Sequence, residues 1–391
     1  MVPEDYDIVI VGSGPAGSAA AVTARRHGLR TALVDKAAFP RDKLCGGGFT
    51  ERSRKEMKAI FERDIDPELF HTCHRVRFTA GDETLGDVDD APPLHMTLRR
   101  DFDTMLHELA VEAGAEPWLR ARIAALDTEA RTLTLNSGDV LRFKLLIGAD
   151  GVNSFVARTL FGRPFDPKRI GFCLEVEAPP RAEKPADRVE IDFRATRWGY
   201  GWVFPKAQSL TLGVGGINVK NPDMKANLAG YLEQNGVDAA ALKFKGQFIP
   251  AGDFRKVPGR GCVLLVGDAA GLVDPITGEG IAHAMSSGAA AAEAAAVALR
   301  AGRPETALGD YRARVAPLHE QIRLARRFRT AVFPSAVHDR FLRIIASRPE
   351  MQRRFLKLLA GETDYTDIRR FFFLRMFRRA VLTAIQGRRA A

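Results

Sequence analysis

Short apolar runs and one alanine-rich stretch alternate near the start of the chain. The β-branched runs Asp7–Val11 and Thr31–Val34 predict two buried parallel strands, because strands that are covered on both faces are apolar throughout. The alanine-rich stretch between them predicts a helix that ends near His27, and the next residue, Gly28, is the type that commonly ends a helix. The start of the chain therefore predicts a β-α-β unit.

The same patterns continue along the chain. A helical pattern covers about Arg100 to Ala113, and buried strands are predicted at Leu145–Ile147 and Cys262–Val266. Short strands with turns fill residues 165–250 and predict a second, mixed sheet. A long helix is predicted from about Glu279 to Leu299, and the pattern after it is helical. The fold class is therefore α/β, with a Rossmann-type domain, a mixed β-sheet domain and a helical C-terminal region.

The length of 391 residues exceeds what one core usually organises, so we expect more than one domain. The predicted domains are discontinuous, because segments assigned to the Rossmann-type domain lie on both sides of each segment assigned to the second sheet. We place the cofactor domain at residues 1–75, 95–164 and 251–310, the substrate domain at 76–94 and 165–250, and a basic helical region at 311–391.

The composition is that of an ordinary globular protein. Hydrophobic residues make up 46% and charged residues 27%, which excludes a disordered or collagen-like chain. Cys45, Cys73, Cys173 and Cys262 include no C-x-x-C pair, and the histidines show no ligand spacing, so neither disulfides nor a metal are expected. No run of about 18 uncharged apolar residues is present, and the N-terminus is acidic where a secretory signal is basic. The sequence predicts a reduced, cytoplasmic protein.

Basic charge is concentrated at the end of the chain. Residues 321–391 hold 17 lysines and arginines against 5 aspartates and glutamates, whereas the whole chain has a net charge of +10. Apolar residues such as Phe371, Phe372 and Phe373 are interleaved with the arginines, which is typical of helices on anionic membranes. A helix that packs its apolar face on the body fits equally well. No nucleic-acid motif accompanies the charge, so we predict no nucleic acid and an anionic membrane surface, the inner face of the plasma membrane, as partner.

A glycine-rich turn joins the first strand to the first helix. Gly12, Gly14 and Gly17 have the spacing that a dinucleotide site uses for a tight turn, close approach to a pyrophosphate and helix packing. The helix that starts near Pro15 would present free N–H groups to the phosphates. Asp35, after the second strand, can accept hydrogen bonds from a ribose and would repel a 2′-phosphate, which disfavours NADP at this first site. The alternative is a glycine turn in an unrelated α/β protein.

Two later motifs follow in the order found in one group of flavoproteins. The segments Gly148–Gly151 and Gly267–Asp268 resemble the D-G and G-D motifs of flavoproteins built on the para-hydroxybenzoate hydroxylase plan. The resemblance implies that Asp268 hydrogen-bonds the ribityl chain of FAD, and that Arg100 contacts FAD from the side. It therefore implies FAD as the cofactor.

The segment Gly278–Gly280 opens the long predicted helix. If this N-terminus faces the flavin pyrimidine ring, its dipole stabilises the negative charge of the reduced flavin. A loop that needs glycine only for its turn is the alternative. The resemblance places Pro275 and Gly278–Gly280 at the isoalloxazine ring. The predicted cofactor residues are Gly12, Gly14, Pro15, Ala16, Gly17, Asp35, Lys36, Arg41, Cys45, Gly46, Arg100, Asp150, Gly151, Gly267, Asp268, Pro275, Gly278, Gly280 and Ile281.

Two segments far apart in the sequence are similar to one family within this group. Phe39–Gly47 has the sequence F-P-R-D-K-L-C-G-G and Tyr200–Pro205 has Y-G-W-V-F-P; both resemble motifs of the geranylgeranyl reductase family. Alternation along a strand places Tyr200, Trp202 and Phe204 on one face, which can contact an apolar chain or belong to the core. The resemblance implies an FAD-dependent reductase that saturates C=C bonds of an isoprenoid chain by hydride transfer from reduced flavin. The predicted substrate-binding residues are Tyr200, Trp202, Phe204 and Pro205.

Cys45 has two interpretations. A lone cysteine is usually a small buried apolar residue, but this one stands beside glycines and near Arg41 and Lys43. In the family that it resembles, the matching cysteine lies near the flavin and affects activity. Cys45, Gly46 and Gly47 are therefore the predicted catalytic residues, and Cys45 is a proton donor, a substrate-positioning group or a structural residue.

Other functions share the predicted fold. An aromatic hydroxylase is one alternative; a halogenase is another, but it needs a lysine between flavin and substrate, and residues 59–143 contain none. A non-catalytic, membrane-associated flavin protein is the alternative of a different class. No second Rossmann unit is present in the sequence, so the electron donor is predicted to be NADPH or a small redox protein. The resemblance does not choose between a prenyl diphosphate, a pigment tail, a quinone and an archaeal-type lipid as substrate.

Overall fold

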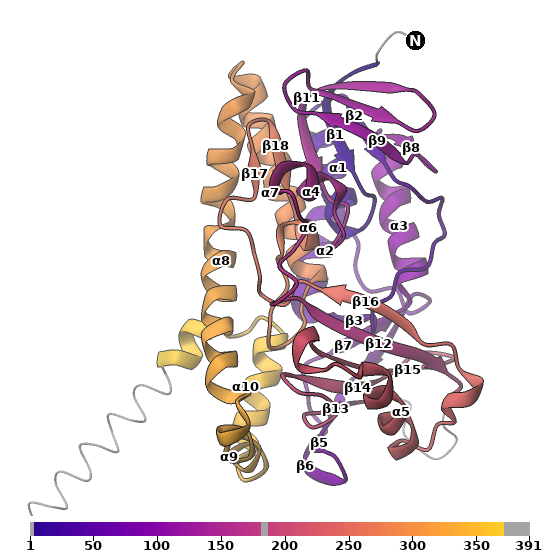
Figure 1. Ribbon diagram of the computed structural model, residues 1–391, viewed down its shortest axis with the longest axis vertical. Coiled ribbons are helices and arrows are strands. Elements are labelled where there is room, and N and C mark those ends of the chain that lie inside the picture. The colour runs from indigo at the N-terminus through magenta and orange to yellow at the C-terminus, as the bar shows by residue number, and fades with distance from the viewer. Residues whose placement is uncertain (1–3, 181–186, 371–391) are drawn as a thin grey trace, which may run out of the picture.

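The computed structural model describes residues 4–180 and 187–370 (Figure 1). Its largest sheet, the first sheet, has eight strands in the order β17-β18-β11-β1-β2-β8, with β10 and β9 added beside β11. Strands β18, β11, β1, β2 and β8 are parallel, as expected of a Rossmann-type sheet. The bounds are β1 (Glu4–Val11), β2 (Thr31–Val34), β8 (Glu116–Trp118), β9 (Ile123–Asp127), β10 (Thr132–Leu135), β11 (Val140–Gly148), β17 (Gly259–Arg260) and β18 (Val263–Leu265).

Helices cover the first sheet, and the predicted β-α-β unit is confirmed. β1 pairs in parallel with β2, and Gly28 follows α1 in the left-handed region with φ +76°. A Cβ atom on Gly288 would lie 2.0 Å from the carbonyl oxygen of Ala16, so glycine is what allows α7 to pack closely on α1. The bounds are α1 (Pro15–Arg26), α2 (Glu51–Phe61), α3 (Arg99–Glu112), α4 (Phe155–Phe161), α6 (Gly267–Ala270), α7 (Ile281–Arg300) and the short η3 (Pro304–Thr306).

A second sheet of seven strands has the order β16-β12-β15-β14-β13-β5-β6, which confirms the predicted mixed sheet. Only the β13–β5 pair is parallel among the described strands of this sheet. One face packs against α5 (Met224–Gln234) through Leu228 and Leu232. The bounds are β5 (Arg75–Ala80), β6 (Glu83–Val88), β12 (Gly171–Ala178), β13 (Arg188–Asp192), β14 (Gly199–Pro205), β15 (Leu210–Ile217) and β16 (Lys245–Ile249), with the short 3₁₀ helices η1 (Asn218–Lys220) and η2 (Ala239–Ala241).

A small antiparallel sheet continues from the segment that contains Cys45. It has the order β3-β7-β4, with β3 (Gly48–Thr50), β7 (Leu94–Thr97) and β4 (Phe70–Cys73). Buried rings of Phe49, Phe70 and Phe102 pack together and tie this sheet to α3. The segment that contains Cys45 is therefore joined at its C-terminal end to a well-packed sheet.

The C-terminal helices pack on both large sheets. Figure 1 shows the long α8 (Ala307–Val332) running beside them, with α9 (Ser335–Ala346) and α10 (Pro349–Leu359) at the level of the second sheet. Ile322 of α8 joins the core of the first sheet, and Leu342 and Leu356 join that of the second. This part of the basic region thus follows the body-packing alternative. In the described ranges, no helix is both long and apolar enough to cross a membrane. The phenylalanines at 371–373 lie outside the described residues.

Candidate active site

A cavity of about 820 Å³ runs from the carboxyl ends of the parallel strands to the second sheet. It brings together residues predicted from segments far apart in the sequence. Gly17, Arg100, Pro205, Gly267 and Pro275 do not line it. The predicted residues that do are Gly12, Gly14, Pro15, Ala16, Asp35, Lys36, Arg41, Cys45, Gly46, Gly47, Asp150, Gly151, Tyr200, Trp202, Phe204, Asp268, Gly278, Gly280 and Ile281.

The glycine-rich turn forms one end of the cavity. Gly12 has φ +100°, and a Cβ on Gly17 would lie 1.7 Å from the carbonyl oxygen of Gly12, so Gly17 serves the packing of the turn and not its open side. At Gly14 an added Cβ would meet nothing closer than the Arg41 guanidinium, at 3.5 Å. Gly14 is also the N-cap of α1 and makes no side-chain cap, so the first N–H groups of the helix remain available. This end fits a pyrophosphate.

Asp35 stands at the end of β2, where the sequence predicts a ribose ligand. Its Oδ2 accepts a hydrogen bond from the N–H of Ser13 at 2.8 Å, and its Oδ1 accepts one from the N–H of Ala37 at 2.9 Å. Each carboxylate oxygen can accept a further hydrogen bond. The side chain is thus fixed in place and can still bind ribose hydroxyls.

Two arginines reach the same end of the cavity, and one of them corrects the prediction for Arg100. Arg41 and Arg99 line the cavity, whereas Arg100 is exposed on α3. The wholly buried carboxylate of Asp103 pairs with Arg99 and with Arg41. The motif located the start of the helix, but one residue along a helix turns the side chain by about 100°, so only Arg99 faces inward.

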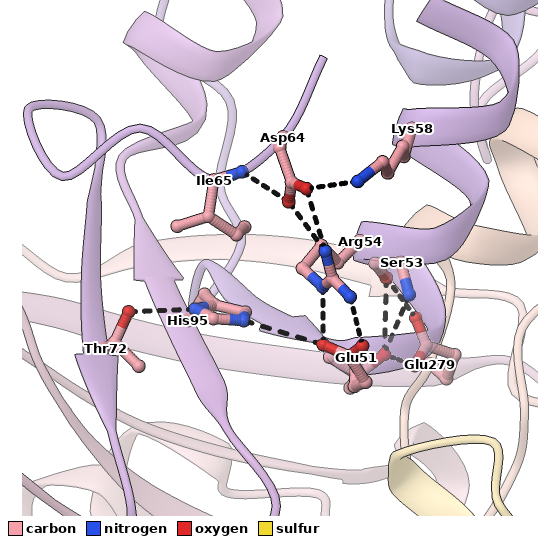
Figure 2. Close-up of polar contacts among 10 residues, drawn as sticks. Glu51, Ser53, Arg54, Lys58, Asp64, Ile65, Thr72, His95 and Glu279 are labelled. Carbon is pink, nitrogen blue, oxygen red and sulfur yellow. Dashed lines mark hydrogen bonds and ion pairs between the residues drawn. The ribbon is translucent and has the colours of Figure 1, made fainter. Parts of the chain in front are cut away.

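The N-terminus of α7 opens toward the cavity, and a polar network fixes the loop before it. Glu279 accepts hydrogen bonds from the hydroxyls of Thr50, at 2.6 Å, and Ser53, at 2.9 Å, at the start of α2 (Figure 2). Burial raises the pKa of Glu279, although these hydrogen bonds act in the opposite direction. Gly280, the N-cap of α7, has no side chain that could cap the helix. Oε1 of Glu279 accepts a hydrogen bond from the N–H of Ala282 at 3.4 Å, so part of this N-terminus is capped and the rest is left to face a ligand. Pro275 packs outside the cavity, near Gly252.

The predicted aromatic stripe lies in the wall of the cavity. The ring centroids of Tyr200 and Trp202 are 6.0 Å apart, and those of Trp202 and Phe204 are 6.1 Å apart. Pro205 follows on the opposite face of β14, so it is buried away from the cavity. The hydroxyl of Tyr200 donates to the carbonyl of Thr277 at 2.7 Å and so joins the second sheet to the α7 loop. The stripe therefore lies where cofactor and substrate would meet.

Beyond the aromatic stripe, the cavity is walled by apolar side chains. They come from β5, β7 and β13 of the two smaller sheets and from the C-terminal helix α10. No lysine, arginine, aspartate or glutamate belongs to this part of the described lining. The residues are Val76, Phe78, Leu94, Met96, Val189, Ile191, Phe355, Leu356 and Leu359.

Comparison with known proteins identifies the family of this chain. The sequence model of the family described as FAD dependent oxidoreductase matches residues 7–141. The digeranylgeranylglycerophospholipid reductase of Methanosarcina mazei is 32% identical over 317 residues, which cover 76% of this chain and 77% of that protein. The chain belongs to the geranylgeranyl reductase family of FAD-dependent oxidoreductases. The menaquinone reductase of Mycolicibacterium smegmatis is 29% identical, over 73% of this chain and 75% of its own.

Solved structures share the fold of this family member. A geranylgeranyl bacteriochlorophyll reductase-like protein from Thermoplasma acidophilum has a TM-score of 0.74 at 22% identity, covering 91% of this chain and 96% of that one. The flavin-dependent brominase Bmp2 has a TM-score of 0.71 at 20% identity, covering 91% and 94%. The fold is therefore common to enzymes of different chemistry, and the site must distinguish them.

The residues of this reductase fit FAD. The uncapped N-terminus of α1, the open side of Gly14 and the paired Arg41 and Arg99 suit a diphosphate. The N-terminus of α7 at Gly280 suits a flavin ring, and Asp35 suits a ribose. When bound, FAD supplies hydride chemistry. The protein supplies backbone N–H groups, fixed cations and an apolar compartment that excludes water.

Cys45 lies in this reductase at the junction of the two parts of the cavity. Its backbone N–H donates to Oε1 of Glu175 at 3.0 Å. Burial by itself would lower the pKa of Arg99, but the Asp103 carboxylate and the Cys45 thiol, which hydrogen-bonds the guanidinium, raise it. The cation beside Cys45 is therefore Arg99, and not Arg41 or Lys43, which are near it in the sequence. Arg41 is engaged with Asp103 and Asp35.

Several parts of the cavity lining were not predicted from the sequence, among them Arg99, Glu175 and the apolar wall. Arg99 stands one residue from the predicted arginine, and its i,i+4 spacing to Asp103 is a signal for an ion pair on one helix face. Glu175 is a charged residue in a mostly apolar strand. It is two residues from Cys173 and so lies on the same face of the strand, which is a signal for a charged group that faces a site. The wall residues of α10 have helical spacing but no local signal for what they contact.

Proposed function

We propose that this enzyme saturates isolated C=C bonds of a long isoprenoid chain, with reduced FAD as the hydride donor. The observation that carries the proposal is the apolar compartment, which is continuous with the cofactor end of the same cavity. An unactivated alkene offers no charge to bind, so its positioning depends on an apolar wall that excludes water. The names of the relatives support a prenylated substrate, and the aromatic stripe is the proposed contact with the reacting bond.

The test is a single-turnover reaction without oxygen. The enzyme is reduced chemically and mixed with geranylgeranyl diphosphate, and flavin oxidation and product mass are followed together. We expect two hydrogens added per flavin oxidised. Oxidation that requires oxygen and yields a hydroxylated or halogenated product would instead support the alternatives of the same fold. No oxidation with geranylgeranyl diphosphate, geranylgeraniol or menaquinone would overturn the proposal.

A variant of the wall tests the role of the apolar compartment. Leu359→Trp fills space between α10 and the second sheet, so we expect KM to rise for geranylgeranyl diphosphate more than for the shorter geranyl diphosphate. Lys357→Trp on the same helix is the matched control, because Lys357 is exposed and outside the cavity. Equal KM changes for both substrates would contradict the placement of the chain in this compartment.

We also propose an anionic membrane surface as a partner, because a prenylated lipid would otherwise have to cross water. Exposed arginines continue on the described helices, at Arg323, Arg327, Arg340 and Arg343. NADPH or a small redox protein stays the predicted electron donor.

A further inference from the structure

Glu175 is a buried carboxyl group in the wall of the cavity, and no family motif of the sequence includes it. It lies on β12 with 6% of its surface exposed and lines the cavity. Oε1 accepts a hydrogen bond from the backbone N–H of Cys45 at 3.0 Å. Oε2 is buried, and no described residue hydrogen-bonds it. A buried polar atom of this kind costs free energy unless something binds it or it is needed for function.

The strand register places Glu175 beside the aromatic stripe. Glu175 is opposite Gly213 of β15, and Gly213 is opposite Trp202 of β14. A Cβ on Gly213 would lie 2.3 Å from the Trp202 ring and 2.9 Å from Cβ of Glu175, so the two side chains flank this glycine on one face. Nε1 of Trp202 also has no described partner, and a Cβ on Gly46 would lie 3.0 Å from it. Two side chains, each with an unpaired buried polar atom, therefore contact the Cys45–Gly46 segment.

The surroundings of Glu175 favour its neutral form. Burial raises its pKa to about 7; Lys206, the N–H of Cys45 and Lys245 act in the opposite direction, and Glu177 adds to the increase. Lys206 does not form an ion pair with Glu175, because its ammonium is bound to Thr211 and Glu177. The titratable groups around the carboxyl are Lys43 and Cys45 of the loop, Cys173 and Glu177 of β12, Lys206 after β14 and Lys245 of β16. A carboxyl that is half protonated near neutral pH can give and regain a proton.

We propose that Glu175 is the proton donor for the reduction at this site. The inference rests on the proposed function. The hydride of the reduced flavin forms a C–H bond at one alkene carbon, the O–H bond of Glu175 breaks, and its proton forms the C–H bond at the other carbon. The flavin is oxidised, the alkene is reduced, and the Glu175 carboxylate takes a proton from water before the next turnover. Cys45 then positions the carboxyl through its main-chain N–H.

The first test detects the proton on the Glu175 carboxyl group directly, without turnover. Infrared spectra of the FAD-bound enzyme should contain a protonated carboxyl band that disappears as the pH rises through about 7. Glu175→Gln should remove this band, whereas Glu83→Gln, an exposed control at the edge of the same sheet, should keep it. A band titrating near pH 7 that persists in the Glu175→Gln spectrum, or the lack of such a band in the wild type, would overturn the assignment.

The second test measures the alkene step in single turnover with geranylgeranyl diphosphate. The wild-type rate should fall as the pH rises through about 7. Glu175→Gln should be slower by on the order of 100-fold and independent of pH, with unchanged FAD content and unchanged chemical reduction of the flavin. Glu175→Asp, which keeps an acid, should recover part of the rate and the pH dependence. Cys45→Ser keeps the main-chain N–H and should keep the pH profile.

The outcomes separate the two proposals. An inactive wild-type enzyme would refute the proposed function. An active wild-type enzyme whose rate and pH profile survive in Glu175→Gln would refute only the role of Glu175. A pH profile that is lost in Cys45→Ser and kept in Glu175→Gln would show that the proton donor is the Cys45 thiol and not Glu175.

Discussion

Arg99 and Asp103 form a double hydrogen bond one turn apart on α3. Nε of Arg99 donates to Oδ1 at 2.6 Å, and Nη2 donates to Oδ2 at 2.9 Å. Oδ2 also lies 3.2 Å from Nη2 of Arg41, which comes from a different segment of the chain. One buried carboxylate therefore holds two cations at the cofactor end of the cavity.

Replacing this carboxylate should affect both stability and FAD binding. In Asp103→Asn, two largely buried guanidinium groups lose their counter-charge, so we expect the free energy of unfolding to fall by about 3 kcal/mol. FAD should also bind more weakly, because Arg41 and Arg99 lose their fixed positions. Urea unfolding and FAD titration measure the two effects. Asp101→Asn, exposed on the same helix, is the control, and equal unfolding midpoints for the two variants would contradict the prediction.

A side chain at Gly14 should prevent FAD binding without preventing folding. An added Cβ would meet only the Arg41 guanidinium at 3.5 Å and Asp103 at 3.8 Å, which are ordinary contacts. The larger side chain of Gly14→Val would occupy the space at the N-terminus of α1 where the pyrophosphate fits. Flavin released by acid from the purified protein should have the mass of FAD in the wild type and be absent in the variant. Gly309→Val, at an exposed position with open space around it, should retain FAD. A flavin-loaded Gly14→Val protein would contradict this placement.

The parts of the site that follow local patterns could be predicted from the sequence. Gly12, Gly14 and Asp35 lie at the ends of two strands whose apolar runs identify them, and the carboxyl ends of parallel strands meet at one edge of a sheet. Alternation alone placed Tyr200, Trp202 and Phe204 on one face, and the structure has all three on the cavity wall. In each case, the pattern that predicts the feature lies within a few residues of the feature itself.

The remaining parts depend on contacts between distant segments. Phe355 of α10 meets Phe78 of β5 with ring centroids 5.9 Å apart, and no local pattern relates two residues so far apart in the sequence. The charge of the C-terminal region indicated a membrane helix, while the burial of α8 and α10 on the sheets comes from their apolar residues. Arg99 was missed by one position. The motif locates the start of the helix only approximately, whereas a shift of one residue changes the direction in which a side chain points.

The glycine between Glu175 and Trp202 should be sensitive to substitution. In Gly213→Ala the new methyl group would lie 2.3 Å from the Trp202 ring, so the indole must move. A displacement of about 1 Å can slow a positioned reaction by about 100-fold, so we expect a slower alkene step with normal FAD content. Gly230→Ala, on the exposed side of α5, is the control because nothing lies within 4 Å of its added Cβ. Unchanged tryptophan fluorescence and an unchanged rate in Gly213→Ala would contradict the packing argument.

Glu175 should also make stability depend on pH. Its pKa is raised from 4.5 in the unfolded chain to about 7 in the folded protein, so the folded protein holds an extra proton between these pH values. The stabilisation is full below about pH 4.5 and is lost as the pH rises through about 7, and it amounts to on the order of 3 kcal/mol. The difference in unfolding free energy between wild type and Glu175→Gln, measured across this pH range, isolates this group from the other buried acids. A constant difference would contradict the raised pKa.

The basic end of the chain should bind anionic membranes reversibly. Near such a surface each arginine contributes at most about 1 kcal/mol, and salt screens the attraction within about 10 Å. Arg375→Gln, Arg378→Gln and Arg379→Gln together should therefore weaken binding by up to about 100-fold at low salt. Arg26→Gln, Arg30→Gln and Arg142→Gln together are the matched control, because they remove the same charge from exposed positions at the end of α1, just before β2 and on β11.

Flotation with liposomes of phosphatidylglycerol and phosphatidylcholine measures this binding. The full chain should float with the anionic liposomes at low salt and progressively less as the salt concentration rises. Equal flotation with pure phosphatidylcholine would indicate that the interleaved phenylalanines bind by insertion and that charge contributes little. Absence of flotation under all conditions would mean that the arginines of this region only face water. Because attachment that weakens with salt is reversible, a prenylated lipid could then be taken up at the surface and reduced without leaving the protein.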